Sequence, residues 1–405
     1  MEVESTNSSG DFGLGGNISY QNRNIFGSAE IFDLKLKGGF ETLREDDRSI
    51  FRNTYEYGVE GNLRIPKFLL PFRSVDFIKR YNPHTSLTIA YNFQRRPDYT
   101  RTIANLSFGY HWQVAPHVTH TIKPIEFNAV HIPFATPAFL DLIRGTLLEH
   151  SYQNHMIAET NYSFVFNNQD IRREQDFVFF RWNFEFAGNT LAAFNNITNG
   201  RRENDSYLLF GTEFAQFFRS DVDLRYYQYF NNGNSLVYRF FAGAGVPYGN
   251  SQAMPLIKRY FSGGANSIRA WHVRSLGPGS FYDETDLTIL NRTGDLKLEA
   301  NLEYRFNLFW VLEGALFLDA GNIWAIDKRD ERAGAVFDFG KFYQDIAIGT
   351  GFGTRFDFTF FIFRVDVGLK LRDPKLMPGN RWIPWNRNLD LGRDMVVNIG
   401  IGYPF

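Results

Sequence analysis

Four charged residues in the second half of the chain have the types and spacing to form an ion-pair cluster. They are Arg269, Glu299, Glu303 and Asp319. Arginine carries a planar fork of donors that binds a carboxylate through two parallel hydrogen bonds. Arg269 lies in a long stretch without regular alternation, whereas the three acids lie in alternating segments. If this long stretch folds back onto the strands, the planar fork of Arg269 would bind a carboxylate there.

Other candidates for chemistry are weaker. His111, His117 and His120 lie close together, but no carboxylate stands at a spacing that would complete a metal site. The glycines of 349–354 suggest a phosphate loop, yet they recur at every second residue, which favours a strand whose glycines clear space. No nucleophile–base pair stands out, so we predict no enzyme activity, no metal and no cofactor. The net charge of −1 indicates no nucleic-acid surface.

The composition indicates the kind of element that must position these residues. The 405 residues include 43 Phe and 20 Tyr, yet 21% of the chain is charged. A soluble protein would need a very large core to bury so many rings. No segment approaches the roughly 18 consecutive apolar residues of a membrane-spanning helix. A closed barrel resolves both facts, because alternate residues of each strand face lipid and lumen.

The predicted fold class is therefore all-β, an antiparallel transmembrane β-barrel of about sixteen strands. Alternation is clearest in 296–306, where Glu299 and Glu303 lie on the polar face. Residues 1–11 are expected to form a short N-terminal segment and residues 12–405 the barrel. The expected strands are 12–20, 25–40, 53–65, 85–95, 101–112, 119–131, 155–167, 176–187, 206–218, 221–230, 235–245, 296–306, 311–324, 343–354, 359–370 and 397–405.

Two kinds of connection between the strands differ from tight turns. The stretches 246–294 and 372–393 are long, and long loops on one rim with short turns on the other are usual in such barrels. Segment 134–150 has apolar residues at helical spacing. It predicts a short amphipathic helix, lying either at the membrane interface or on the barrel rim.

The segment around Arg269 resembles a known family, the outer-membrane assembly and translocation barrels that include BamA and TamA, also called the bacterial surface antigen family. In that family the sixth extracellular loop carries Val/Ile-Arg-Gly-Phe/Tyr after a glycine-rich approach. Here the loop reads Gly263-Gly264, then Ile268-Arg269-Ala270-Trp271. The resemblance implies that this loop folds into the lumen. Ala270 replaces the usual glycine, and this replacement favours a TamA-like or otherwise divergent member of the family.

The resemblance extends to the strands that follow this loop. The family's Phe-x-Asp-x-Gly motif matches Phe317, Asp319 and Gly321, and an acidic residue late in the intervening strand matches Glu303. Alternation independently places Asp319 on one face with Phe317 and Gly321. Together these matches imply that Arg269 binds lumen carboxylates, with Asp319, Glu303 and Glu299 as the candidates.

The last residues carry a further prediction. Ile401, Tyr403 and Phe405 continue one apolar face, and the ending resembles the signal by which assembly machinery recognises client barrels. On this prediction Phe405 closes the barrel and anchors at the membrane interface.

The seam between the first and last strands is predicted to be the working edge. The expected first strand carries Gly13 and Gly15, and the last carries Gly400 and Gly402. Glycine-rich strands pair weakly, and in the family these two strands are thought to part. The alternative is that the glycines only make room inside the lumen.

The resemblance implies a barrel that inserts or translocates proteins at the bacterial outer membrane. The expected partners are outer-membrane lipid and lipopolysaccharide, client outer-membrane or surface proteins, and periplasmic or lipoprotein accessory subunits. A secretion pore of the two-partner type and a passive solute porin are the alternatives. Periplasmic POTRA repeats are expected upstream of Met1, and their number would separate these functions.

Overall fold

A computed structural model provides the fold of the chain. It describes residues 2–7, 12–44, 51–69, 81–144, 147–170, 173–198, 202–203, 206–230, 233–282, 292–358 and 361–405.

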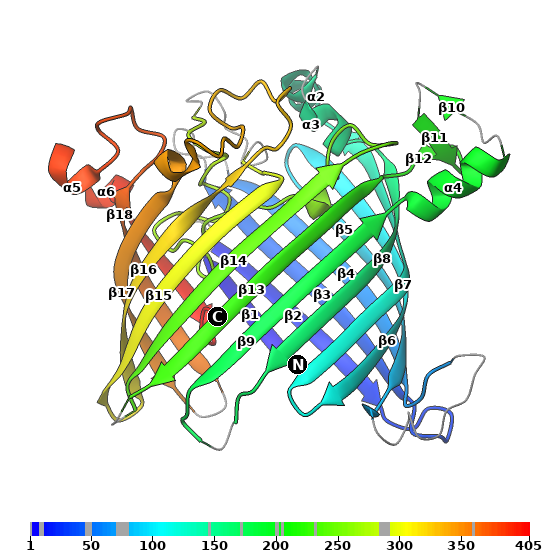
Figure 1. The fold of residues 1–405 in the computed structure, drawn as a ribbon, viewed down its shortest axis with the longest axis horizontal. Coiled ribbons are helices and arrows are strands. Elements are labelled where there is room, and N and C mark those ends of the chain that lie inside the picture. The colour runs from blue at the N-terminus through cyan, green and yellow to red at the C-terminus, as the bar shows by residue number, and fades with distance from the viewer. Residues whose placement is uncertain are drawn as a thin grey trace.

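The described residues form one antiparallel sheet of sixteen strands that curls into a barrel (Figure 1). Neighbours in the sheet follow the order of the chain, as in an up-and-down barrel. The strands are β1 Glu2–Asn7, β2 Phe12–Asn22, β3 Ile31–Arg44, β4 Phe51–Ile65, β5 His84–Arg95, β6 Tyr99–Ala115, β7 Val118–Ala135, β8 His155–Asn167, β9 Phe177–Ala187, β13 Phe217–Tyr229, β14 Ser235–Pro247, β15 Leu296–Phe309, β16 Leu312–Trp324, β17 Ala347–Asp357, β18 Ile362–Arg372 and β19 Met395–Ile401.

The predicted architecture is confirmed, but two strand predictions are wrong. Residues 2–7, expected to precede the barrel, form β1 and pair with β2. Segment 206–218, expected to be one wall strand, instead contributes to a separate three-stranded sheet and only the start of β13. This small sheet consists of β10 Arg202–Glu203, β11 Ser206–Leu209 and β12 Thr212–Glu213. The two errors offset each other, so the expected number of strands is nevertheless right.

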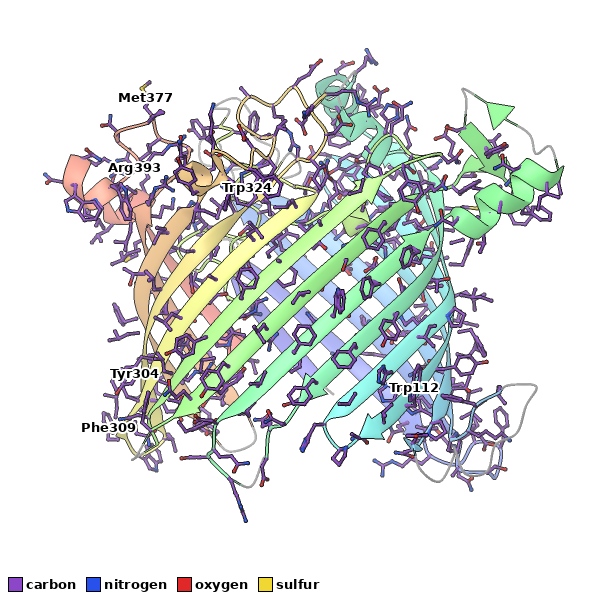
Figure 2. The ribbon with its side chains drawn as sticks, in the orientation of Figure 1. Trp112, Tyr304, Phe309, Trp324, Met377 and Arg393 are labelled. Atoms are coloured by element: carbon purple, nitrogen blue, oxygen red, sulfur yellow. The ribbon has the colours of Figure 1, made fainter. Side chains whose placement is uncertain are left out.

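The wall separates apolar and polar side chains as the alternation predicts. Leu316 and Ile89 face outwards, with 54% and 60% of their surface exposed, whereas Glu303 and Asp319 face the lumen and are fully buried. Rings cover much of the outer surface in Figure 2, where Tyr304 and Trp112 lie towards the same end of the barrel. Aromatic side chains at this level are typical of barrels that cross a membrane.

Helices and long loops gather at one end of the barrel, which we take as the extracellular end because the other end carries mostly short turns (Figure 1). The helices are α2 Pro137–Ile143, α3 Leu147–Ser151, α4 Asn189–Thr198, α5 Ile383–Asn386 and α6 Leu391–Asp394, with 3-10 turns η1 Leu256–Lys258 and η3 Phe342–Asp345. No helix among the described residues is long and apolar enough to cross a membrane.

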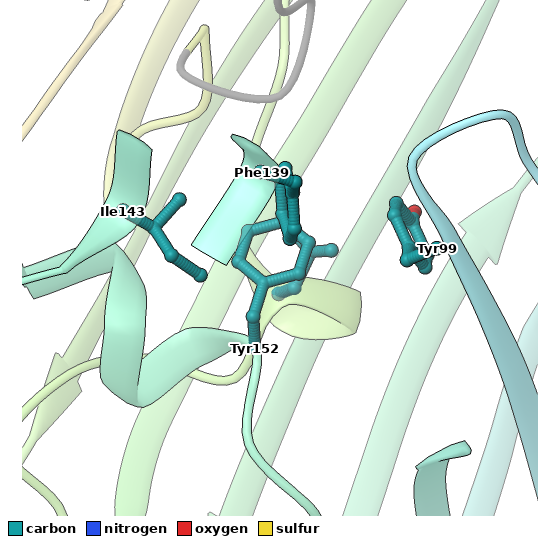
Figure 3. Close-up of a cluster of buried hydrophobic side chains, with 5 residues drawn as sticks. Tyr99, Phe139, Ile143 and Tyr152 are labelled. Atoms are coloured by element: carbon teal, nitrogen blue, oxygen red, sulfur yellow. The ribbon is translucent and has the colours of Figure 1, made fainter. Parts of the chain in front are cut away.

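The helix predicted within 134–150 is present as two short helices, α2 and α3, on the barrel rim. Phe139 and Ile143 of α2 pack against Tyr152 and against Tyr99 at the start of β6 (Figure 3). The rings of Phe139 and Tyr152 meet edge to face at 5.0 Å between centroids. These contacts bury the apolar face of the segment against protein, as the rim alternative predicted.

Candidate functional site

The loop between β14 and β15 enters the barrel as a hairpin. Ser262 bridges to Leu276, and the amide of Gly264 donates to the carbonyl oxygen of Trp271 at 2.7 Å. Gly263 and Gly264 have φ of +95° and +94°, a backbone region that only glycine adopts readily. The Gly-Gly approach therefore turns the chain so that residues 265–271 form a tip, of which residues 267–271 are buried.

Arg269 lies at this tip and is completely buried. Its Nε and Nη2 donate to the two carboxylate oxygens of Asp319 at 2.8 and 2.9 Å, and its backbone amide donates to the same side chain at 3.0 Å. Its Nη1 donates to Glu303. The guanidinium also lies 3.6 Å from the centre of the Phe317 ring. The edges of the guanidinium group thus donate hydrogen bonds to carboxylates, and one of its faces contacts a ring.

The sheet register explains why these groups meet. Glu303 of β15 stands opposite Phe317 of β16, and Asn301 stands opposite Asp319. Directly opposed residues point to the same side of a sheet, so all four side chains face the lumen beneath the loop. Asn301 donates from its side-chain amide to Asp319 at 2.9 Å and to the carbonyl oxygen of Ser267 at 3.0 Å. The strand wall and the loop therefore share one hydrogen-bond network.

Ala270 and Trp271 fill a hollow in the wall made by glycine. Both are buried, and they pack with Ile268 in one cluster. A Cβ at Gly349 of β17 would lie only 2.5 Å from the Cβ of Ala270, so this position must stay free of a side chain. Ala270 has no positive φ, which means that alanine in place of glycine causes no backbone strain. The alternating glycine at position 349 clears space for the loop.

Glu299, the third predicted carboxylate, holds a different part of the hairpin. It accepts hydrogen bonds from the hydroxyls of Ser267 and Ser262, the latter at 3.1 Å, and it forms an ion pair with Lys297 at 2.9 Å. Gly321 of β16 stands opposite Glu299 and leaves no room for a Cβ against the β15 backbone. Glu299 therefore holds the base of the tip, while Arg269 holds its end.

Further residues of this site were not singled out from the sequence. Arg355 binds Glu303 at 3.1 Å and Asp366 at 2.7 Å. Arg364 donates to the loop carbonyl of Ala265 at 3.0 Å, and Asn398 of β19 donates to the carbonyl oxygen of Arg269 at 2.9 Å. Alternation places Arg364 on a polar face, but the pattern carries no signal for its partner in a loop about 100 residues away.

The end of the chain differs from its prediction. β19 ends at Ile401, and Gly402, with φ of +81°, turns the last residues into the lumen. Phe405 is buried with Tyr227 and Val237, lumen-facing residues of β13 and β14. The Arg269 guanidinium lies 5.7 Å from its ring centre. The prediction that Phe405 anchors at the membrane interface and closes the barrel is therefore wrong.

Tyr403 follows the same inward course. Its hydroxyl donates to Glu313 at 2.9 Å, and the Arg305 guanidinium lies 4.0 Å from its ring centre. Arg305 in turn binds Glu303 at 2.7 Å. The terminal residues and the Arg269 loop therefore contact the same carboxylate-rich wall, Tyr403 through Arg305 and Phe405 through Arg269.

The predicted glycine seam also needs correction. Gly13 and Gly15 lie in β2, where they pair with β1 on one side and with β3 on the other. The strand that borders β19 is β1, and β1 contains no glycine. Gly400 does lie in β19, and a Cβ there would come within 2.7 Å of the Arg364 side chain. Its absence of a side chain thus makes room inside the lumen, as the alternative interpretation predicted.

Comparisons with known proteins agree with this geometry. Residues 8–403 match the model of the Omp85 superfamily domain. Similar solved structures include BamA from Haemophilus ducreyi lacking POTRA domains 1–3, with 13% identity and a TM-score of 0.62 over 99% of this chain and 68% of that one. CdiB from Acinetobacter baumannii has 11% identity and a TM-score of 0.54 over 98% and 58% of the two chains.

CdiB from Escherichia coli has 12% identity and a TM-score of 0.55 over 98% of this chain and 61% of that one. At these identities the likeness is one of fold. The chain spans less than two thirds of either CdiB. A comparison with curated proteins finds no match.

Proposed function

Because the chain belongs to the Omp85 superfamily, we propose that it inserts client proteins into the outer membrane through a lateral seam between β1 and β19. The protein is an outer-membrane β-barrel of a Gram-negative bacterium, and its superfamily serves membrane-protein insertion or secretion. The proposal goes beyond membership of the superfamily in two respects. It assigns insertion rather than secretion, and it assigns this seam as the place of insertion.

The observation that carries the proposal is the weak edge of the sheet. β1 and β19 contain six and seven residues, whereas the other wall strands contain eleven to eighteen. Their Cα atoms come within 8 Å of each other. The described residues nevertheless show no paired ladder between these two strands. An unpaired strand edge can add a strand from another chain through its free backbone groups.

The C-terminal residues keep the edge strand β19 short. The amide of Gly402 still donates to the carbonyl oxygen of Ile362 at 2.8 Å, but the chain then turns into the lumen, so β19 remains a strand of seven residues. A client strand could form backbone hydrogen bonds at the exposed edge without displacing a long ladder. The mechanism uses strand pairing in place of covalent chemistry. Client proteins, surrounding lipid and accessory subunits are its proposed partners.

The lumen contacts bear on the alternatives. The Arg269 hairpin and the terminal residues occupy the lumen beside β14 to β19, and they are held by buried ion pairs. A passive solute pore would need this volume to be open to water, so the arrangement disfavours a porin. A dedicated secretion pore would need the hairpin to leave the lumen during transport. Insertion at the seam does not require that movement.

Cysteine crosslinking tests the seam, because the chain contains no cysteine. A series of cysteine pairs, one in β1 and one in β19, would be oxidised in membranes, and insertion of a client barrel would then be measured. We expect an oxidised seam to lose most of its insertion activity and reduction to restore it. The matched control is Phe180→Cys with Leu224→Cys, positions paired across β9 and β13 within the continuous wall.

The control disulfide should leave client insertion unchanged. Full activity with an oxidised β1–β19 pair would contradict the seam mechanism. If the same oxidised pair left secretion of a dedicated partner intact while no client insertion could be measured in any state, the two-partner alternative would be favoured instead.

A further inference from the structure

The segment that leads into the Arg269 hairpin has an ionic contact of its own. This entry arm, residues 254–260, precedes the hairpin of residues 262–276 and contains the 3-10 turn η1. The Nζ of Lys258 lies 2.7 Å from Oε1 of Glu159 and 2.8 Å from Oε2 of Glu185. The Glu159 side chain is completely buried, and only 14% of the Lys258 side chain is exposed. Because lysine is rarely buried without a partner, the two carboxylates account for this position.

Both carboxylates belong to the middle of the wall, away from the Arg269 site. Ala187 of β9 stands opposite Glu159 of β8, and Glu185 lies two residues before Ala187 on the same face. Both acidic side chains therefore face the lumen, where Lys258 reaches them. In the sheet, β13 and β14 separate β9 from β15, the strand that carries Glu303. The entry arm and the hairpin are thus bound to different parts of the wall.

Apolar packing holds the entry arm on the same part of the wall. Met254 packs with Ile157 of β8 and with Phe217 of β13. The carbonyl oxygen of Met254 accepts a hydrogen bond from the Ser151 hydroxyl at 2.9 Å. Leu256 joins the aromatic cluster on the barrel rim. None of these contacts involves the hairpin, so they do not depend on its position.

The end of the entry arm also lies against the wall. Arg259 forms an ion pair with Asp295 at 3.1 Å. The Tyr260 hydroxyl donates to the carbonyl oxygen of Ser220 in β13 at 3.3 Å. A Cβ at Gly243 of β14 would lie only 2.6 Å from this hydroxyl, so the glycine makes room for the ring. The arm is therefore held against β13 and β14 almost to the start of the hairpin.

Two glycines separate the entry arm from the tip that carries Arg269. Gly263 and Gly264 both have positive φ, which glycine adopts without strain. We propose that Lys258 anchors the entry arm independently of Arg269. Release of the tip then moves residues 265–271 about the two glycines, while the arm stays on β8 and β9. The inference concerns the loop alone, and it is tested without a client protein.

Single cysteines report the two parts separately, because the chain contains no cysteine. Leu256→Cys, at a position 7% exposed, reports the entry arm, and Ser267→Cys, at a position 8% exposed, reports the tip. Labelling by a membrane-impermeant maleimide would be measured on the folded barrel in lipid vesicles. Lys258→Met keeps the side-chain length but leaves two carboxylates without this cation. We expect it to label at least tenfold faster at Leu256→Cys and less than about twofold faster at Ser267→Cys. Arg269→Ala should show the opposite pattern.

Two further variants separate the anchor from a general loosening of the barrel. Lys258→Arg keeps a cation and should restore slow labelling at Leu256→Cys. Lys375→Met removes a lysine at the same end of the barrel, whose ion pair with Asp373 is long at 3.9 Å, and it should change neither rate. Retained heat-modifiable migration would show that each variant is folded. If Lys258→Met does not fold, Lys258→Met with Glu159→Gln replaces it, because this pair leaves one buried carboxylate fewer.

Two results would overturn the inference. Unchanged labelling of the entry arm in Lys258→Met would show that Lys258 does not anchor it. Equal acceleration at both cysteines, in Lys258→Met or in Arg269→Ala, would show that the arm and the tip move as one unit. Neither result bears on the β1–β19 seam, which the client-insertion experiment tests separately.

Discussion

The two halves of the barrel wall use ion pairs in different surroundings. On the N-terminal side, Lys37 of β3 binds Glu60 of β4 at 2.7 Å, with 45% and 35% of the two side chains exposed. On the C-terminal side, Arg269 binds Asp319 at 2.8 Å with both side chains completely buried. Both pairs join a cation to a carboxylate at nearly the same distance, but they differ in residue type and in the access of water.

The comparison shows that a loop, and not the strands, determines whether the ion pairs of the wall are exposed to water. The 262–276 hairpin covers the carboxylates of β15 and β16, whereas the Lys37–Glu60 pair remains open to water. A buried charge without its partner is strongly destabilising, whereas an exposed pair contributes little. The C-terminal wall and the hairpin therefore depend on each other, and the Lys37–Glu60 pair can be changed with small effect.

The largest effect is expected for Arg269→Ala. The substitution leaves Asp319 and Glu303 in the lumen wall without their shared cation, and breaking a buried pair costs about 3–5 kcal/mol. We expect the hairpin to lose its position, with client insertion falling at least tenfold, while the barrel still migrates as a folded, heat-modifiable species. Insertion assays on membranes would measure the loss. Arg269→Lys keeps the charge but not the planar fork, so its client insertion should lie between that of Arg269→Ala and that of the unchanged protein.

An intermediate effect is expected for Phe405→Ala. Removing a buried ring from its contacts with Tyr227 and Val237 should lower the free energy of unfolding by about 3 kcal/mol, the lower end for buried Phe→Ala changes. Urea unfolding from lipid vesicles would measure it. Ile401→Ala on the lipid-facing side is the matched control and should cost less, since its side chain is 55% exposed. Equal losses would contradict the lumen position of Phe405.

The smallest effect is expected for Lys37→Gln. Both side chains of its ion pair with Glu60 are accessible to water, and such pairs contribute about 0.2–1 kcal/mol to the free energy of unfolding. Unfolding of this variant in vesicles should differ from the unchanged protein by less than 1 kcal/mol, and client insertion should not change. A loss as large as that of Arg269→Ala would show that the two walls do not differ in the way described.

The faces of the wall strands could be predicted because alternation is a local property of the backbone. Parity alone placed Glu299 and Glu303 on the polar face of their strand, and it placed Asp319 on one face with Phe317 and Gly321. The course of the chain after Ile401 could not be predicted in this way. Tyr403 and Phe405 continue the same parity, and the turn at Gly402 depends on contacts with β13 and β14, which lie far away in sequence.

The strand prediction for segment 206–218, before β13, was wrong for a related reason. Residues 206–213 alternate as a wall strand does, but they pair among themselves in the β10–β12 sheet and lie beside the barrel (Figure 1). Parity cannot distinguish a wall strand from a short hairpin of the same composition. The partner of Arg364 was missed because this contact joins a strand to a loop whose path only the folded chain defines. The partners of Arg355 were missed because alternation does not show which carboxylates of other strands lie beside it across the lumen wall.

The position of the hairpin can be measured directly with one cysteine. Ser267→Cys places a thiol at a site that is 8% exposed, in a chain that otherwise has none. Labelling by a membrane-impermeant maleimide would be compared with and without Arg269→Ala. We expect slow labelling when Arg269 is present and labelling at least tenfold faster when it is absent. Equal rates in the two proteins would contradict the claim that Arg269 holds the hairpin in the lumen.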